Sequence, residues 1–157
     1  METLPPLTFE NFDNSYSAEL NTWQQKENSL GYDGLNDFVV SRGTGLGDYL
    51  QFVNDEMPDV SCLLAFDQNT LAGFISYTNP TEQHTHIEIM GVNPDLRGQG
   101  MASRLLLDFK QMMQEKTNIQ QLTLDVNKKN SSGRKAFAKV GTVSPEQKKE
   151  DYITFNL

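Results

Sequence analysis

The sequence predicts a mixed α/β fold in which a helix connects two parallel strands of one sheet. Apolar, β-prone runs alternate with segments whose apolar residues recur at helical spacing. A helix-length segment separates two of these runs, as a connection between parallel strands requires. The chain of 157 residues is about one domain long and can bury a core without disulfides. We therefore expect a single domain over residues 1–157.

The N-terminal third predicts two helices joined by a loop. Apolar side chains at helical spacing indicate an amphipathic helix over about residues 15–26. Five of the eleven glycines fall between Gly31 and Gly47, which indicates a loop with short turns. A second helix is expected over residues 48–55, and Pro58 would stop it.

The remainder predicts a regular order of strands and helices. The turn-favouring residues from Asp67 to Thr70 indicate a hairpin, and Pro94 ends the next strand. The apolar face of the helix after Gly100 indicates that it packs on the sheet. The expected elements are strands at 61–66, 71–79 and 84–92, a helix after residue 100, a strand at 121–126, a helix at 130–140 and a strand at 152–155.

The net charge of −8 is unevenly distributed along the chain. Residues 1–96 contain two basic and fifteen acidic residues, whereas residues 97–157 contain eleven basic and six acidic residues. The acidic first part argues against nucleic acid as a partner, because such binding neutralises phosphates with Lys and Arg. Two interpretations stay open: an unevenly charged surface, or an anionic ligand on the C-terminal part with a cationic one near the N-terminal part.

Several features exclude other classes of protein. The N-terminus lacks the basic start and apolar core of a signal peptide, and no apolar run approaches the ~20 residues that cross a bilayer. We expect a cytoplasmic protein with no membrane partner. Cys62 lies in an apolar run and is expected to be a buried structural thiol. No residues near it resemble a metal-ligand cluster, so no metal site is predicted.

The segment from Val92 to Ala102 is the main candidate site. A strand leads into a tight loop that contains Gly98 and Gly100, and a helix follows directly. The unpaired N–H groups and the dipole of that helix would hold an anion, with the dipole adding about 0.3–2 kcal/mol. Arg97 would add a contact to a phosphate.

Spacing excludes two common phosphate sites. The nucleotide P-loop ends in Gly-Lys-Ser/Thr, which the residues after Gly100 do not supply. In a dinucleotide fingerprint, Ser103 would have to be a glycine or alanine, and no second mononucleotide-binding half remains in the chain.

Two motifs instead resemble the GNAT acetyltransferase superfamily. Arg97, Gly100 and Ala102 match its Arg/Gln-x-x-Gly-x-Gly/Ala motif for acetyl-CoA. The segment from Asn130 to Gly141 is similar to the Asn-rich helix of the family, which ends in Tyr-x-Lys-x-Gly. The resemblance covers about residues 61–157. It implies an N-acetyltransferase that moves the acetyl group of acetyl-CoA to a primary amine.

The resemblance also implies the arrangement of the sheet. We expect about six or seven mostly antiparallel strands, about four flanking helices, and a gap where the parallel strands at 84–92 and 121–126 splay apart. In such enzymes the pantetheine arm lies in this gap. A bulge near Met90 and Gly91 is expected to free backbone N–H groups, and that of Met90 or Val92 would polarise the thioester carbonyl.

A set of cofactor-binding residues follows from the resemblance. The diphosphate would rest on the N–H groups of the loop and the first helical turn, and Asn130 would contact the pantetheine arm. Phe137 stands where the family usually has a tyrosine that protonates the departing sulfur; Tyr77 and Tyr152 are substitutes that the sequence does not place. The implied residues are Met90, Gly91, Val92, Arg97, Gly98, Gln99, Gly100, Met101, Ala102, Asn130 and Phe137.

Strand periodicity suggests a candidate for the general base. His84, His86 and Glu88 are expected on one side of their strand, with Ile87 and Ile89 on the other. The resemblance implies Glu88 as the base, acting through a water, because similar enzymes often carry a carboxylate on this strand; a base so placed accelerates such reactions about 10²–10⁴-fold. Glu88 as a solvent-facing residue and the two histidines as surface residues stay open as alternatives.

Three functions remain open at this point. The first is an enzyme acetylating a primary amine, with a cationic acceptor favoured by the acidic N-terminal part. The second is an acetyl-CoA-binding module without turnover, which Phe137 motivates. The third is an unrelated α/β domain that binds an anion at the same helix terminus. The oligomeric state, including a homodimer, is left open.

Overall fold

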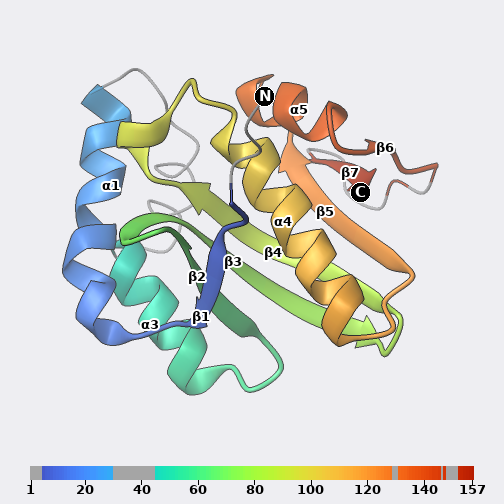
Figure 1. Ribbon diagram of the computed structural model, residues 1–157, viewed down its shortest axis with the longest axis horizontal. Helices are drawn as coiled ribbons and strands as arrows, with labels where there is room; N and C mark the ends of the chain where they lie inside the picture. The colour runs from blue at the N-terminus through green and yellow to red at the C-terminus, as the bar shows by residue number, and fades with distance from the viewer. Residues whose placement is uncertain (1–4, 30–44, 129–130, 146, 148–151) are drawn as a thin grey trace.

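The computed structural model describes residues 5–29, 45–128, 131–145, 147 and 152–157, and these build one seven-stranded sheet with helices packed on it (Figure 1). The strands are β1 (Thr8–Asn11), β2 (Ser61–Asp67), β3 (Thr70–Thr81), β4 (His84–Val92), β5 (Gln121–Asn127), β6 (Thr142–Val143) and β7 (Tyr152–Asn156). The helices are α1 (Ser17–Ser29), α3 (Leu46–Glu56), α4 (Met101–Lys116) and α5 (Ser131–Ala138), with short 3-10 turns η1 (Asn14–Tyr16) and η2 (Pro94–Leu96).

The order of strands across the sheet is β1-β2-β3-β4-β5-β7-β6, and all neighbours are antiparallel except β4 and β5. The predicted mixed α/β fold, with its helix joining a parallel pair, is confirmed. All the strands and helices that the sequence predicts within the described residues are present. The sequence missed β1 and β6, which are only four and two residues long.

Two apolar cores lie on the two faces of the sheet. In Figure 1, α1 and α3 lie next to one another at the β1–β3 side of the sheet, and α4 runs across the strands. The α4-side core includes Leu105, Leu106, Phe109 and Met113 of α4 together with Ala65, Ile75, Ile87, Leu122 and Leu124 of the sheet. The α1/α3-side core includes Leu20, Trp23, Leu46 and Leu50 together with Cys62, Leu64, Phe66 and Phe74.

The parallel pair β4–β5 separates part-way along its length. Residues His84–Ile87 pair with Gln121–Leu124, and the pairing ends there. Beyond it β4 continues to Val92 and β5 to Asn127. The predicted splay is thus confirmed, and it opens at the C-terminal ends of both strands.

The bulge of β4 lies two residues before its predicted position. Met90 and Gly91 pair regularly with β3, so the prediction of a bulge at these two residues is wrong. The pairing instead skips Glu88, because Ile87 lies opposite Tyr77 while Ile89 lies opposite Ser76. One extra residue reverses the alternation of side chains. Ile87 therefore packs in the α4-side core and Ile89 against the α1/α3-side core, which corrects the expectation that they share a face.

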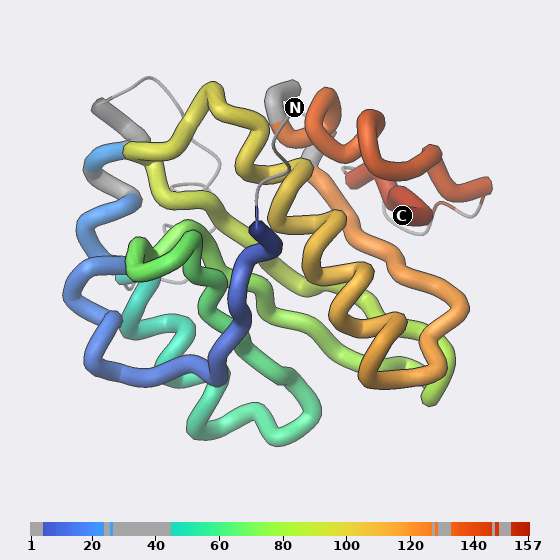
Figure 2. Tube along the Cα trace, viewed as in Figure 1, coloured from blue at the N-terminus to red at the C-terminus, as the bar shows by residue number. Residues whose placement is uncertain are grey.

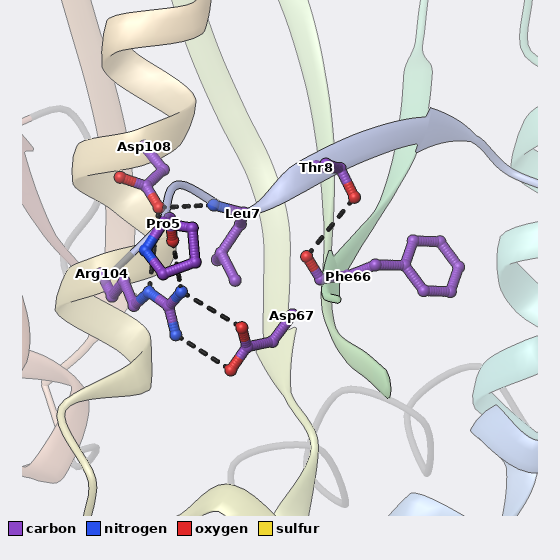
Figure 3. A network of polar contacts seen from close by, with 7 residues as sticks. All are labelled: Pro5, Leu7, Thr8, Phe66, Asp67, Arg104 and Asp108. Carbon is purple, nitrogen blue, oxygen red and sulfur yellow. Dashed lines mark hydrogen bonds and ion pairs between the residues drawn. The ribbon is translucent and has the colours of Figure 1, made fainter. Parts of the chain in front are cut away.

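A polar network fastens the N-terminal segment and the β2–β3 turn to α4 (Figure 3). The Arg104 guanidinium donates to both carboxylate oxygens of Asp67, at 3.1 and 3.2 Å, and to the Pro5 carbonyl at 2.7 Å. One turn later, the Asp108 carboxylate accepts from the Leu7 N–H at 2.9 Å. These contacts fix the first two turns of α4 relative to the sheet.

Two further expectations concern single features. Cys62 is buried in the α1/α3-side core, as predicted. Burial raises the pKa of its thiol to about 12. Of the helices in the described part of the chain, none has the length and apolar character that crossing a membrane requires.

Candidate active site

The loop of residues 93–100 is held against the sheet by a buried asparagine. The Asn93 N–H donates to the Ala72 carbonyl at 2.8 Å, and its side-chain amide donates to the Leu71 carbonyl at 2.9 Å. Its side-chain oxygen accepts from the Asp95 N–H at 2.9 Å and so begins η2. One side chain therefore fixes the exit of β4 and the first turn of the loop, and Figure 2 shows the chain leaving β4 and entering α4 through it.

The start of α4 leaves its first N–H groups without a side-chain cap. Gly98 and Gly100 have φ of 78° and 72°, in the left-handed region that glycine adopts without strain. Gly100 is the N-cap, it supplies no side-chain hydrogen bond, and the first turn contains no acidic residue. A Cβ added at either glycine would meet no atom within 4 Å. The residues present therefore fit an anion: open space, uncapped donors and the positive end of a 16-residue helix.

The other residues predicted for this loop differ in exposure. Gln99 is exposed together with the two glycines, and Arg97 is half-buried. Met101 is buried in the α4-side core, whereas Ala102 is half-buried beside it. The side chain of Met101 thus anchors the helix, and only its N–H is directed toward the loop end.

Backbone alternation identifies which N–H groups of β4 face the gap. The Asn93 N–H points to β3, where it binds Ala72. Because successive residues of a strand point their N–H groups to opposite neighbours, that of Gly91 also points to β3. The N–H groups of Met90 and Val92 therefore point toward β5, beyond the place where pairing with β5 has ended. Of the three predicted residues, Met90 and Val92 offer donors to the gap, and Gly91 does not.

Glu88 occupies the bulge itself. Its side chain is exposed, and its Oε1 accepts a hydrogen bond from the Thr78 hydroxyl at 3.0 Å. Thr78 lies opposite His86 in the antiparallel pairing, so Glu88 lies on the same face as His86. This face is the one opposite α4, because Ile87 between them packs on α4.

A cluster of polar side chains lies on that face where β4 and β5 begin to separate. His84 Nε2 and His86 Nδ1 each lie 2.7 Å from the Thr123 hydroxyl. His86 Nε2 lies 3.6 Å from Asp125 Oδ2, and the other oxygen of that carboxylate accepts from the Thr154 hydroxyl at 2.5 Å. Both His86 and Asp125 are largely buried, with side chains 20% and 15% exposed.

No sequence motif predicts a role for Thr123 and Asp125. The available signal was the alternation on β5, where Leu122, Leu124 and Val126 face the α4-side core and the two polar residues face the other way. Their proximity to the histidines depends on the parallel register, which pairs His86 with Thr123.

A comparison with known families identifies the chain. The model of the acetyltransferase (GNAT) family matches residues 18–142. The chain belongs to this family. The resemblance that two short motifs suggested is thereby confirmed over most of the sequence. No curated protein matches the GNAT chain significantly.

Solved structures with the same fold are acetyltransferases of low sequence identity. An acetyltransferase from Thermus thermophilus has a TM-score of 0.71 and 14% identity, and the alignment covers 98% of this chain and 99% of that one. The Campylobacter jejuni N-acetyltransferase PseH, in complex with acetyl coenzyme A, has a TM-score of 0.67 and 18% identity over 96% and 97% of the two chains. The Thermoplasma acidophilum PaiA N-acetyltransferase, in complex with coenzyme A, has a TM-score of 0.66 and 17% identity over 97% and 98%.

Phe137, the residue at which this GNAT chain departs from the family motif, is a core residue. The ring is 7% exposed, lies in the α4-side core and meets Phe155 edge-on, with centroids 6.0 Å apart. Tyr77 packs its ring on Phe109 at 5.2 Å, and Tyr152 is 39% exposed on β7. Asn130 lies outside the described residues. Among the residues that are described, no group of three or more His, Cys, Asp or Glu side chains could hold a metal ion.

Proposed function

We propose that this GNAT protein transfers the acetyl group of acetyl-CoA to a primary amine of a small molecule or peptide. One observation carries the proposal: the uncapped start of α4 and the gap between β4 and β5 lie at the same end of the sheet. Both follow the C-terminal ends of the parallel strands, where α/β proteins commonly bind their ligands. A molecule with a diphosphate and a long narrow arm fits this combination.

In the proposed complex, the coenzyme lies along the loop and the gap. The diphosphate accepts hydrogen bonds from the N–H groups of residues 98–102, and Arg97 adds its charge. The pantetheine arm enters the gap, where Asn130 contacts it and Phe137 forms part of the apolar wall. The N–H of Met90 or Val92 donates to the thioester carbonyl and stabilises the oxyanion of the tetrahedral intermediate. Acetyl coenzyme A and coenzyme A in the PseH and PaiA structures support this assignment.

The proposed reaction is direct attack by the amine. Its nitrogen forms a bond to the carbonyl carbon, and the carbon–sulfur bond then breaks. Glu88, through a water, takes the proton that the nitrogen loses as the new bond forms. With phenylalanine at position 137, the sulfur leaves as a thiolate that takes its proton from water, since an ordinary thiol has a pKa of about 8.5.

A cationic acceptor is the second part of the proposal. The described surface around the gap carries the exposed Glu88 and the partly exposed Asp125 on the face opposite α4. One structural relative, from Salmonella typhimurium, modifies the N-terminal serine of a ribosomal protein. Polyamines, aminoglycosides and basic peptides are therefore the acceptors to test first.

Two measurements test the function. Acetyl-CoA should raise the melting temperature, because a ligand that binds the folded state stabilises it. Release of free coenzyme A across a panel of primary amines should then reveal turnover. A melting shift without turnover on any amine would favour the alternative, an acetyl-CoA-binding module. The absence of any shift would contradict the cofactor assignment itself.

Glu88→Gln tests the base. The substitution keeps the shape of the side chain and removes its proton affinity, so kcat should fall about 10²–10⁴-fold while the Kd for acetyl-CoA changes little. Glu82→Gln is the matched control, since Glu82 is an exposed carboxylate in the β3–β4 turn. Equal turnover of the two variants would show that Glu88 is not the base.

A further inference from the structure

Among the described ion pairs, His86 and Asp125 bring an imidazole close to a carboxylate on the side of the sheet opposite α4. Asp125 follows the last paired residue of β5, Leu124, and His86 precedes the last paired residue of β4, Ile87. The two side chains therefore flank the point where the gap begins. The α1/α3-side core on this face includes Ile89 of β4 but, among the described residues, no residue of β5 or β7.

Hydrogen bonding allows His86 Nε2 to act as a proton acceptor. The Thr123 hydroxyl has one proton and lies 2.7 Å from both histidines, so it can accept from one ring and donate to the other. If it accepts from His86 Nδ1–H and donates to His84 Nε2, all three groups are satisfied. His86 Nε2 then carries a lone pair and lies 3.6 Å from Asp125 Oδ2.

That separation is too long for a direct hydrogen bond but short enough for one atom to bridge. An amine nitrogen at hydrogen-bond distance from Asp125 Oδ2 can also lie at hydrogen-bond distance from His86 Nε2. The Thr154 hydroxyl holds the opposite oxygen of the carboxylate and so fixes its orientation. The other described titratable groups near this cluster on the same face are His84, Glu88 and Tyr152, which shares the face of Thr154 on β7.

We propose that Asp125 and His86 form an ammonium site: Asp125 binds the protonated acceptor amine, and His86 Nε2 takes its first proton before attack. The inference rests on the proposed acetyl transfer. It adds a catalytic residue and specifies the cationic acceptors as strongly basic primary amines that are ammonium ions at neutral pH. Glu88 keeps its separate role in removing the second proton.

The proton balance requires two acceptors. The ammonium ion loses one proton to His86 Nε2 and becomes the free amine, and the imidazolium formed is paired with Asp125. The amine then attacks the thioester carbon, the carbon–sulfur bond breaks, and the nitrogen gives a second proton through water to Glu88. One of the two protons returns to the coenzyme A thiolate and the other leaves to solvent.

The test compares two acceptors that differ in basicity but not in shape: the best alkylamine of the panel, and its fluorinated analogue, whose amine is neutral at pH 7. His86→Asn and Asp125→Asn should each lower kcat/KM for the alkylamine about 100-fold and affect the analogue far less. The Kd for acetyl-CoA should stay unchanged. Glu82→Gln, at the exposed carboxylate of the β3–β4 turn, is the control and should leave the ratio of the two rates as in the wild type.

Added imidazole separates a chemical role from a structural one. It should restore turnover of the alkylamine in His86→Asn but not in Asp125→Asn. An equal loss on both acceptors, or rates that match the wild type, would overturn the ammonium site even if wild-type acetyl transfer is robust. Absence of turnover by the wild type on every amine would instead refute the proposed function, and the ammonium site with it.

Discussion

Gly98 and Gly100 determine the conformation of the loop that is proposed to bind the diphosphate. Both have φ above 70°, where a side chain costs about 1–2 kcal/mol, and neither would meet a neighbouring atom through an added Cβ. Their role is therefore conformational, and the empty space beside them is available to a ligand.

Gly100→Ala should accordingly lower the free energy of unfolding by about 1 kcal/mol and weaken acetyl-CoA binding, because the first turn of α4 must shift to relieve the strain. Chemical denaturation and calorimetric titration measure the two effects. Gly100→Asn is the control, since asparagine tolerates the left-handed conformation better. Equal losses in both variants would indicate a steric cause in place of the backbone one.

Cys62 illustrates a residue whose chemistry is suppressed by its surroundings. Burial raises the pKa of the thiol from 9.0 to about 12. The folded state thus favours the protonated form, and this contribution to stability is present below pH 9 and decreases as the pH rises toward 12.

Two consequences of the Cys62 environment can be measured. At pH 8 the native protein should react with a thiol reagent far more slowly than the unfolded chain, so coenzyme A release can be followed with such a reagent. Between pH 9 and 12, the free energy of unfolding should decrease more steeply in the wild type than in Cys62→Ala. Rapid labelling of the native thiol would contradict its burial.

The network around Arg104 joins separate elements of the structure. It connects the end of β2 and the N-terminal segment to the helix whose N-terminus is proposed to hold the diphosphate. The Arg104 side chain is 17% exposed, so its hydrogen bonds are partly shielded from water.

Arg104→Ala should therefore lower the free energy of unfolding by about 2 kcal/mol, because it leaves the Asp67 carboxylate and the Pro5 carbonyl without this donor. Lys110→Ala, on the same helix, is the matched control and should have a smaller effect. Arg104→Lys should recover part of the loss, as it keeps the charge but not the two-pronged contact. Denaturant midpoints of the four proteins compare these effects.

The elements also show which parts of the structure local sequence can predict. Pro94 predicts the end of β4, and the glycines that precede α4 predict its start. The bulge at Glu88 was misplaced, because a bulge depends on how β4 pairs with Tyr77 and Ser76 of β3. The contact between His86 and Thr123, 37 residues apart, depends on register in the same way. β6 forms only by pairing with β7 and carries no periodic signal of its own.

At the scale of the whole molecule, the excess of acidic residues in the first part of the chain predicts electrostatic attraction of cationic acceptors. The described gap surface carries Glu88, one of the fifteen acidic residues of the first part of the chain, and Asp125 of the second part. Salt screens such attraction over about 10 Å at 0.1 M ionic strength and over about 3 Å at 1 M.

With acetyl-CoA at saturation, kcat/KM for a polyamine should fall more steeply with added salt than that for a monoamine of similar length. The expected cause is weaker capture of the acceptor, so KM should rise while kcat changes less. Steady-state kinetics at several salt concentrations measures this difference. Equal salt dependence, or faster turnover of anionic amines, would contradict the cationic preference.

The short parallel ladder divides the sheet into two unequal leaves. Strands β1 to β4 form one leaf and β5, β7 and β6 the other, and in the described residues their strand pairing spans four positions, His84–Ile87 with Gln121–Leu124. A small rotation about this short pairing would widen the gap at its open end, while the hydrogen bonds within each part of the sheet stay intact. A ligand bound between the two parts would contact both, so its binding should make the whole molecule more rigid.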